Sequence, residues 1–284
     1  MMNKIEIKQV NKTFGQTKAL VNVSVDFLPE KIYGLLGRNG AGKSTLLNII
    51  SNRIFADNGS VLVDGKKAEE NDSALNKIYL MSEKSYYPET MKVKEVFYWT
   101  KEFYGAFNID KAYKLAELFG LDISKKTGKL STGYSSIFKI IISLCLDVPY
   151  IFLDEPVLGL DANHREMFYK LLLEEYAENP RTYVISTHLI EEISSLIEEV
   201  IIIKNGKVIE NCSSEKLLSS GYTVSGSADK VDAFTKDKKV IGSDMLGGLK
   251  SVYVLGKMNP AELPEGLEIT KLDMQKLFIQ LTNA

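Results

Sequence analysis

The sequence predicts an α/β fold with a mainly parallel sheet and an antiparallel portion near the N-terminus. Apolar, strand-like segments that are each followed by helically spaced apolar residues predict the parallel part; they lie at residues 31–36, 78–81, 150–153 and 182–186. Segments 5–10 and 21–27 instead alternate apolar and polar residues with no helical pattern between them, which is typical of half-buried antiparallel strands. Strands that alternate with helices indicate a parallel sheet covered by helices.

The remaining elements follow from the same two periodicities. Further strands are expected at residues 61–63, 200–203 and 208–209, and helices after residue 45, at 93–104, 111–119, after 133, at 163–176 and at 189–197. The pattern weakens near residues 219–221, and short strands at 223–226, 252–255 and 267–270 then precede an amphipathic helix at 273–281. We therefore expect a large α/β domain at residues 1–221, with a helical subdomain at about 84–147, and a small α/β accessory domain at 222–284.

Composition places the chain among ordinary globular proteins. It has 284 residues, of which 45% are hydrophobic and 25% charged, so it can bury a sizeable core. A net charge of −2 argues against a general nucleic-acid-binding protein. Cys145 and Cys212 lie far apart without metal-ligand spacing, which suits a reducing cytoplasm, and Cys145 is expected in the core. We expect no signal peptide, and no apolar run approaches the roughly 20 residues that span a bilayer.

Eight consecutive residues fit the phosphate-binding pattern G-x-x-x-x-G-K-[ST], and Thr45 continues the segment; the eight are Gly37, Arg38, Asn39, Gly40, Ala41, Gly42, Lys43 and Ser44. In this motif, backbone N–H groups and the helix start hold phosphate, Lys43 reaches the terminal phosphates, and the Ser44 hydroxyl can bind Mg²⁺. The alternative is a chance glycine-rich turn, and the strand before it and the helix after it argue against that. The chain is expected to bind a nucleoside triphosphate.

Two carboxylates follow a buried strand. Residues 150–153 are apolar and lead directly into Asp154 and Glu155. A parallel strand that ends in Asp delivers a negative charge to the sheet edge where ligands bind, so we expect Asp154 to help hold the Mg²⁺ bound by Ser44. Glu155 lies one residue beyond, where it can orient or deprotonate an attacking water molecule. This pair, together with the phosphate loop, predicts hydrolysis as well as binding.

The segment Leu130-Ser131-Thr132-Gly133-Tyr134 precedes this strand and opens a helix. It resembles the Leu-Ser-Gly-Gly-Gln signature of ATP-binding-cassette (ABC) ATPases, with Thr132 and Tyr134 as departures. In that family the signature faces the γ-phosphate of ATP bound to the opposite subunit, which assigns Ser131 and Gly133 to nucleotide binding. An ordinary N-capped helix is the alternative for the segment alone, because serine is a favourable N-cap.

Further residues match the same family in order along the chain. Phe14 resembles the aromatic residue that stacks on adenine, although taken alone it would be read as a core residue. Glu83 falls where the family has a Gln that ligates Mg²⁺, and a carboxylate can take that role. Asp161 lies in a segment that crosses the dimer interface, and His188 matches the histidine that contacts the γ-phosphate.

The resemblance covers roughly residues 3–217 and implies an ATPase that uses ATP and Mg²⁺. It implies two cassettes, as a homodimer or a heterodimer, that sandwich two ATP molecules, with Lys43 neutralising phosphate charge and Glu155 and His188 in catalysis. A separately encoded transmembrane permease is the implied partner, and no nucleic acid is expected. The implied location is cytoplasmic, on the inner face of the membrane through the permease.

Two classes of function compete. One is the energy-coupling subunit of a membrane transporter, and the other is a soluble ABC-type ATPase acting on DNA or ribosomes, which usually shows a coiled-coil insertion or two cassettes in one chain. Neither feature is present, so the transporter is favoured. Glu83, the Ser-Thr-Gly-Tyr signature and residues 277–282 resemble bacterial exporters of the ABC-2, bacitracin-resistance type. Aromatic residues between 86 and 99 are expected to line a groove for the permease, or alternatively to pack the helical subdomain.

Overall fold

Three β-sheets lie along the chain of this computed structural model, which describes residues 3–257 and 263–283. The first is an antiparallel sheet of order β2-β1-β4-β5, formed by Thr17–Phe27, Ile5–Phe14, Asn58–Val63 and Lys66–Lys67. Strand β1 lies between its two neighbours, and its buried Ile5 pairs with Phe27 of β2 and with Val63 of β4. The antiparallel portion expected near the N-terminus is present.

The second sheet contains the strand that precedes the phosphate loop and the strand that ends in Asp154. Its order is β10-β9-β3-β8-β7-β6, and the strands are Lys207–Ser213, Glu199–Lys204, Ile32–Leu36, Thr182–Thr187, Tyr150–Asp154 and Ile78–Met81. All neighbours in it are parallel except β9 and β10. The central strands β3 and β7 are buried along their whole length, as expected for a sheet covered on both faces. The predicted α/β class is confirmed.

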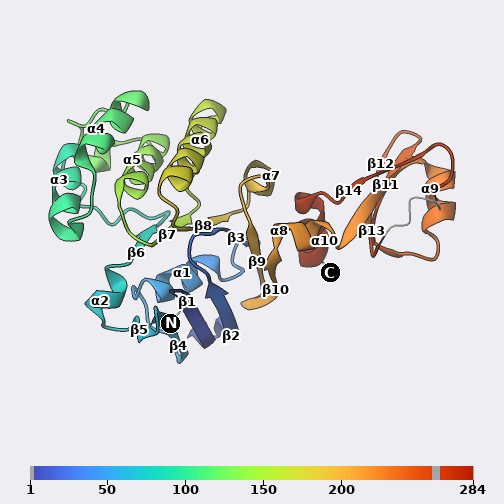
Figure 1. Ribbon diagram of the computed structural model, residues 1–284, viewed down its shortest axis with the longest axis horizontal. Helices are drawn as coiled ribbons and strands as arrows, with labels where there is room; N and C mark the ends of the chain where they lie inside the picture. The colour runs from blue at the N-terminus through green and yellow to red at the C-terminus, as the bar shows by residue number, and fades with distance from the viewer. Residues whose placement is uncertain (1–2, 258–262, 284) are drawn as a thin grey trace.

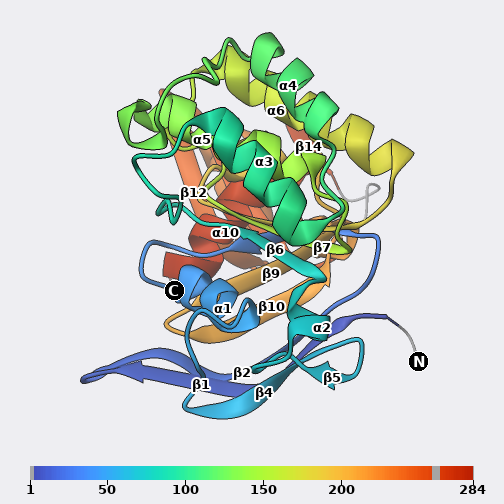
Figure 2. The ribbon, with the colours of Figure 1, turned by 90° about the vertical axis from the view of Figure 1, so that its left-hand side faces the viewer.

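Helices cover both faces of this sheet. Helix α1 (Lys43–Ile50) lies between it and the antiparallel sheet, where Leu46 and Leu47 are buried with residues of both (Figure 2). The opposite face carries α3 (Val93–Tyr104), α4 (Ile109–Leu118), α5 (Thr132–Cys145) and α6 (Ala162–Glu178). Two one-turn elements complete this part of the chain, α2 (Asp72–Leu75) and a 3₁₀ turn, η1 (Thr127–Lys129).

The third sheet belongs to the C-terminal part of the chain and lies at one end of the long axis (Figure 1). It has the antiparallel order β12-β13-β11-β14, formed by Lys239–Leu246, Leu249–Leu255, Gly221–Ser227 and Leu267–Lys271. Helix α8 (Ser214–Leu218) leads into it, and α9 (Ala228–Thr235) packs on it through Val231. Its small core contains Val224 and Val252.

The last helix, α10 (Met274–Asn283), leaves the third sheet and returns to the second. Its Leu277 and Phe278 are buried in the same core as Ile190 and Ile193 of α7 (Ile190–Ile193). Helix α7 is shorter than the helix predicted at residues 189–197. The Ser194 hydroxyl donates to the carbonyl oxygen of Glu191 at 3.0 Å, and such local bonds from serine favour helix ends over helix interiors.

Candidate active site

The phosphate loop is held in a conformation that only glycine adopts easily. Gly42 is the N-cap of α1 with φ +112°, and a Cβ there would lie 2.5 Å from the carbonyl oxygen of Ala19 in β2. No side chain caps the helix. The first N–H groups of α1 are therefore available for an anion, at the helix end where the dipole is positive.

Lys43 is the first residue of α1, and its side chain reaches back over the loop. Its side chain is buried, and Nζ donates to the carbonyl oxygen of Gly37 at 2.6 Å. Burial lowers the pKa of the Lys43 ammonium, against the opposing effect of the nearby carboxylates of Glu155 and Asp154. Its hydrogen-bond acceptors are neutral carbonyls, so a phosphate oxygen would be a stronger partner for the ammonium than the loop itself.

Phe14 is exposed and does not lie in the core. About half of its side chain is accessible, and its ring helps line a hollow of about 590 Å³ together with Ser44 and Thr45. The Lys12 ammonium lies 5.4 Å from the centre of the Phe14 ring. An exposed ring beside the start of α1 can stack on a base while the loop holds the phosphates.

Asp154 is the last residue of β7 and lies at the carboxyl edge of the sheet. Its carboxylate is buried, and Oδ1 accepts a hydrogen bond from the Ser186 hydroxyl at 2.8 Å. Ser186 belongs to β8, the neighbouring parallel strand, so the two strands fix the carboxylate at their common edge.

Glu155 turns sharply away from the strand. Its φ is +49°, in the left-handed region that non-glycine residues rarely adopt. The turn directs the carboxylate to the loop after β8, where Oε2 lies 3.0 Å from His188 Nδ1 and accepts from the Thr187 hydroxyl at 3.2 Å. Such backbone strain is characteristic of functional positions, and here it brings an acid and a histidine together.

The sequence-predicted residues fall into two groups. The phosphate loop, Asp154, Glu155 and His188 come together at the sheet edge, and Lys43 feels the charge of both carboxylates. Ser131, Gly133 and Asp161 form a second group around the loop after Glu155. Across residues 3–257 and 263–283, no hydrogen bond or ion pair joins this second group to the phosphate loop.

Close backbone packing holds the second group. A Cβ at Gly133 would lie 2.7 Å from the carbonyl oxygen of Gly159, so the start of α5 and this loop touch directly. The Ser131 hydroxyl caps α5 by accepting from the Tyr134 N–H at 3.3 Å, and its own hydrogen remains available to donate. The Asp161 carboxylate caps α6 and lies beside the ring of His164, and these hydrogen bonds lower its pKa.

The residues fit Mg²⁺ only if a phosphate supplies further ligands. The described part of the chain holds no group of three or more His, Cys, Asp and Glu that could bind a metal by itself. Mg²⁺ typically takes one or two protein oxygens and completes its octahedron with phosphate oxygens and water, and Ser44 and Asp154 suit that role. Glu83 is exposed, and its described contact is made by its backbone oxygen, which accepts from Lys139 Nζ at 2.7 Å.

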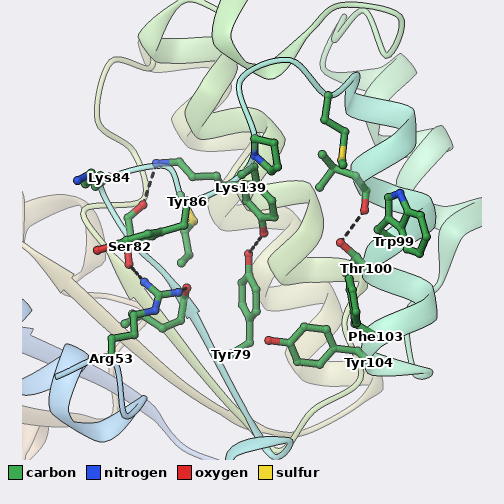
Figure 3. Close-up of a pocket in the computed structure, with 16 residues that line it drawn as sticks. Arg53, Tyr79, Ser82, Lys84, Tyr86, Trp99, Thr100, Phe103, Tyr104 and Lys139 are labelled. Atoms are coloured by element: carbon green, nitrogen blue, oxygen red, sulfur yellow. Dashed lines mark hydrogen bonds between the residues drawn. The ribbon is translucent and has the colours of Figure 1, made fainter. Parts of the chain in front are cut away.

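A second hollow is an apolar groove, drawn in Figure 3. It has a volume of about 470 Å³ and lies between the end of β6 and helix α3, with Trp99, Phe103 and Tyr104 on one side. Tyr86 and Trp99 are about half exposed, whereas Phe97 is fully buried against Phe138. The predicted aromatic residues therefore divide between the groove and the core of the helical subdomain.

Arg53 and Tyr86 line both the groove and the nucleotide hollow. The guanidinium lies 4.6 Å from the centre of the Tyr86 ring, donates to the Leu80 carbonyl at 2.9 Å and contacts the Ser82 hydroxyl. Lys139 of α5, buried, donates to the carbonyl oxygen of Ser82 at 2.8 Å. Neither cation was identified from the sequence; a lysine inside the apolar run 137–142 was the available signal for Lys139.

Comparisons with known proteins identify the family of the chain. A family model described as ABC transporter matches residues 20–158. The ABC transporter ATP-binding protein MJ1023 of Methanocaldococcus jannaschii is 31% identical over 218 residues, which cover 74% of this chain and 77% of that protein. The chain belongs to the ATP-binding proteins of ABC transporters. YtrB of Bacillus subtilis, another ABC transporter ATP-binding protein, is 30% identical over 196 residues, which cover 69% of this chain and 67% of YtrB.

Solved structures place the chain in the same fold. A dimeric post-hydrolysis state of the ABC cassette MJ0796 bound to ADP and Pi has a TM-score of 0.66 and 25% identity, covering 74% of this chain and 98% of that one. The chain is thus an ABC-type ATPase with a P-loop α/β cassette. It spans 44% of the length of another relative, the ribose import protein RbsA of Bacillus subtilis. No described helix is long and apolar enough to cross a membrane.

Proposed function

We propose that this ABC ATPase powers a separately encoded membrane permease, working as a dimer on the inner face of the membrane. The observation that carries the proposal is the aromatic groove. Its exposed Trp99 and Phe103 are neighbours, with ring centres 5.9 Å apart, and contiguous exposed apolar surface of this kind marks interaction sites. Arg53 and Tyr86 line both this groove and the nucleotide hollow. A helix bound in the groove and a nucleotide bound in the hollow would therefore both lie beside these two side chains.

The occupant we propose is an apolar cytoplasmic helix of the permease. Three cations line the groove, namely Arg53, Lys84 and Lys139, and none of the described residues lining it is acidic. Charge complementarity therefore favours a helix that carries a carboxylate beside its apolar face. Trp99 is the single tryptophan of the chain, so its fluorescence reports on this groove alone.

The proposed reaction is ATP hydrolysis at an interface of two chains. The phosphate loop and Lys43 hold the triphosphate, and Ser44 and Asp154 would hold Mg²⁺, which neutralises phosphate charge when bound. Glu155 orients or deprotonates the attacking water, and His188, 3.0 Å from its carboxylate, fixes its direction. Ser131 and Gly133 are proposed to complete the site of the opposite chain, because no hydrogen bond or ion pair among the described residues joins them to the phosphate loop of their own chain.

The finer proposal is a bacterial exporter of peptides, antimicrobials or other amphipathic compounds. It is supported by Glu83, by the Ser-Thr-Gly-Tyr signature and by residues 277–282, whereas RbsA, the relative above with a named substrate, is an import protein. The second cassette of the proposed dimer is either another copy of this chain or a different ATPase subunit. The alternative function is a soluble ATPase acting on DNA or ribosomes.

The test is reconstitution with a membrane permease that co-purifies with this chain. Co-purification of the two, and ATP-dependent movement of substrate across vesicles that stops in the Glu155→Gln variant, would support the transporter. The direction of that movement separates exporter from importer. Co-sedimentation with ribosomes or DNA, without a stable permease complex, would favour the alternative.

A further inference from the structure

The last turn of α10 lies against the phosphate loop. Arg38 Nη1 donates to Asn283 Oδ1 at 3.0 Å, although the two residues are separated by 245 positions. Lys204 Nζ donates to the carbonyl oxygen of Leu281 at 3.4 Å. Between them is a hollow of about 440 Å³, lined on one side by Arg38, Asn39 and Gly40 and on the other by Thr282 and Asn283.

The same helix is anchored to the other nucleotide-contacting segment. Leu277 and Phe278 are buried against the core that includes Ile190 and Ile193 of α7. Helix α7 begins two residues after His188. One helix therefore bridges the loop that is proposed to hold phosphate and the segment that carries the histidine beside Glu155.

The charges favour this contact when no phosphate is present. The C-terminal end of a helix carries a partial negative charge, and cations near it are stabilising. Arg38 and Lys204 stand at that end of α10 and donate to it. A bound triphosphate offers a full negative charge at the adjacent loop and competes for the Arg38 guanidinium.

The contact also occupies a surface that the dimer would need. Arg38, Asn39 and Gly40 are exposed, and the end of α10 reaches across the hollow beside them to contact Arg38. We propose that the last turn of α10 is a latch, which shields this surface from a second copy of the chain until ATP binds and then releases it. The proposal rests on the proposed ATP-bound dimer and adds to it a regulatory role for the C-terminal part.

The test compares ATP-driven dimerisation of three proteins, all in the Glu155→Gln background so that ATP persists. The variants are Asn283→Ala, which removes the hydrogen bond to Arg38, and Gln275→Ala, a matched control in the first turn of the same helix. Mass is measured by light scattering during titration with ATP and Mg²⁺. One hydrogen bond predicts that Asn283→Ala dimerises at about two- to tenfold less ATP, while Gln275→Ala matches the parent.

Hydrogen exchange of the peptide covering α10 provides the second measurement. Release of the latch predicts that amides of the last turn exchange faster once ATP and Mg²⁺ are added to the parent protein. Dimerisation with an unchanged midpoint in Asn283→Ala and unchanged exchange would overturn the latch alone. A higher ATP requirement in Asn283→Ala would overturn it too, because α10 would then support the site. The absence of any ATP-driven dimer in all three proteins would overturn the proposed dimer and the latch together.

Discussion

His188 Nδ1 lies 3.0 Å from Glu155 Oε2, across two neighbouring parallel strands. The contact exists because Glu155 adopts a left-handed backbone conformation that turns its side chain toward the end of β8. A carboxylate held by a histidine and by the Thr187 hydroxyl has a fixed direction before substrate arrives. Preorganisation of this kind lowers the cost of reaching the transition state.

Glu155→Gln is expected to keep ATP binding and to lose turnover by a factor of about 10² to 10⁴, since the amide cannot act as a base. Phosphate release and fluorescent-nucleotide titration measure the two properties separately. Glu191→Gln, an exposed acid on α7, is the matched control and should retain activity. Robust steady-state hydrolysis by Glu155→Gln would remove Glu155 from this role.

Lys43→Ala is expected to weaken nucleotide affinity by about 10- to 100-fold, because the variant loses charge-assisted hydrogen bonds to phosphate. Lys12→Ala is a suitable comparison, since that ammonium lies near the Phe14 ring but outside the loop. Titration with a fluorescent ATP analogue reports both values. An unchanged affinity in Lys43→Ala would contradict the assignment of the phosphate loop.

Gly133→Ala tests the contact between the start of α5 and the loop after Glu155. The added Cβ would lie 2.7 Å from the carbonyl oxygen of Gly159, and relief of this overlap is expected to cost about 1–3 kcal/mol of stability. Gly248→Ala is the control, because a Cβ there meets nothing within 4 Å. Thermal unfolding measures the loss. Equal melting temperatures for the two variants would show that the start of α5 can move away without cost.

Periodicity and motifs predicted most of this arrangement because strands, helices and the phosphate loop are local features. The separation into two groups of site residues was also implied, by the family resemblance. The sequence did not predict the contacts of Arg53 with Tyr86 and of Arg38 with Asn283, because neither pair has a local sequence signal. Strand β12 was missed as well, since Val240, Met245 and Leu246 are exposed and give no inward-facing alternation.

Stability is expected to fall as the pH rises above about 9, and the buried thiol of Cys145 contributes to the fall. Burial raises its pKa from 9.0 to about 12. Below pH 9 the thiol is protonated in both states and its contribution is fully present. Between pH 9 and 12 only the unfolded chain ionises, so the contribution is lost at roughly 1 kcal/mol per pH unit.

Cys145→Ala should therefore show a shallower decline in the free energy of unfolding between pH 9 and 11 than the parent protein. Cys212→Ala is the comparison: burial raises the pKa of that thiol in the same direction, but it is only partly buried, so its removal should flatten the decline less. Urea unfolding at a series of pH values gives both slopes. Parallel slopes for Cys145→Ala and the parent would show that Cys145 does not titrate in this way.

The groove can be tested with two neighbouring tyrosines that have different surroundings. Tyr86 is 60% exposed, so Tyr86→Ala is expected to leave the melting temperature nearly unchanged and to weaken binding of a permease helix. The Tyr87 hydroxyl lies 2.9 Å from that of Tyr79, and its ring packs on Phe138, so Tyr87→Ala should lower stability by about 2–4 kcal/mol.

Synthetic peptides from the cytoplasmic loops of a permease that co-purifies with the chain, read by Trp99 fluorescence, measure binding directly. A peptide that carries a carboxylate beside its apolar face should bind more tightly than the same peptide with glutamine there, and high salt should reduce the difference, because Arg53 and Lys84 line the groove. Full binding by Tyr86→Ala, or a preference for the glutamine peptide, would place the permease contact elsewhere on the chain. Nucleotide affinity should fall less in Tyr86→Ala than in Lys43→Ala, because Tyr86 lines the nucleotide hollow but is not part of the phosphate loop.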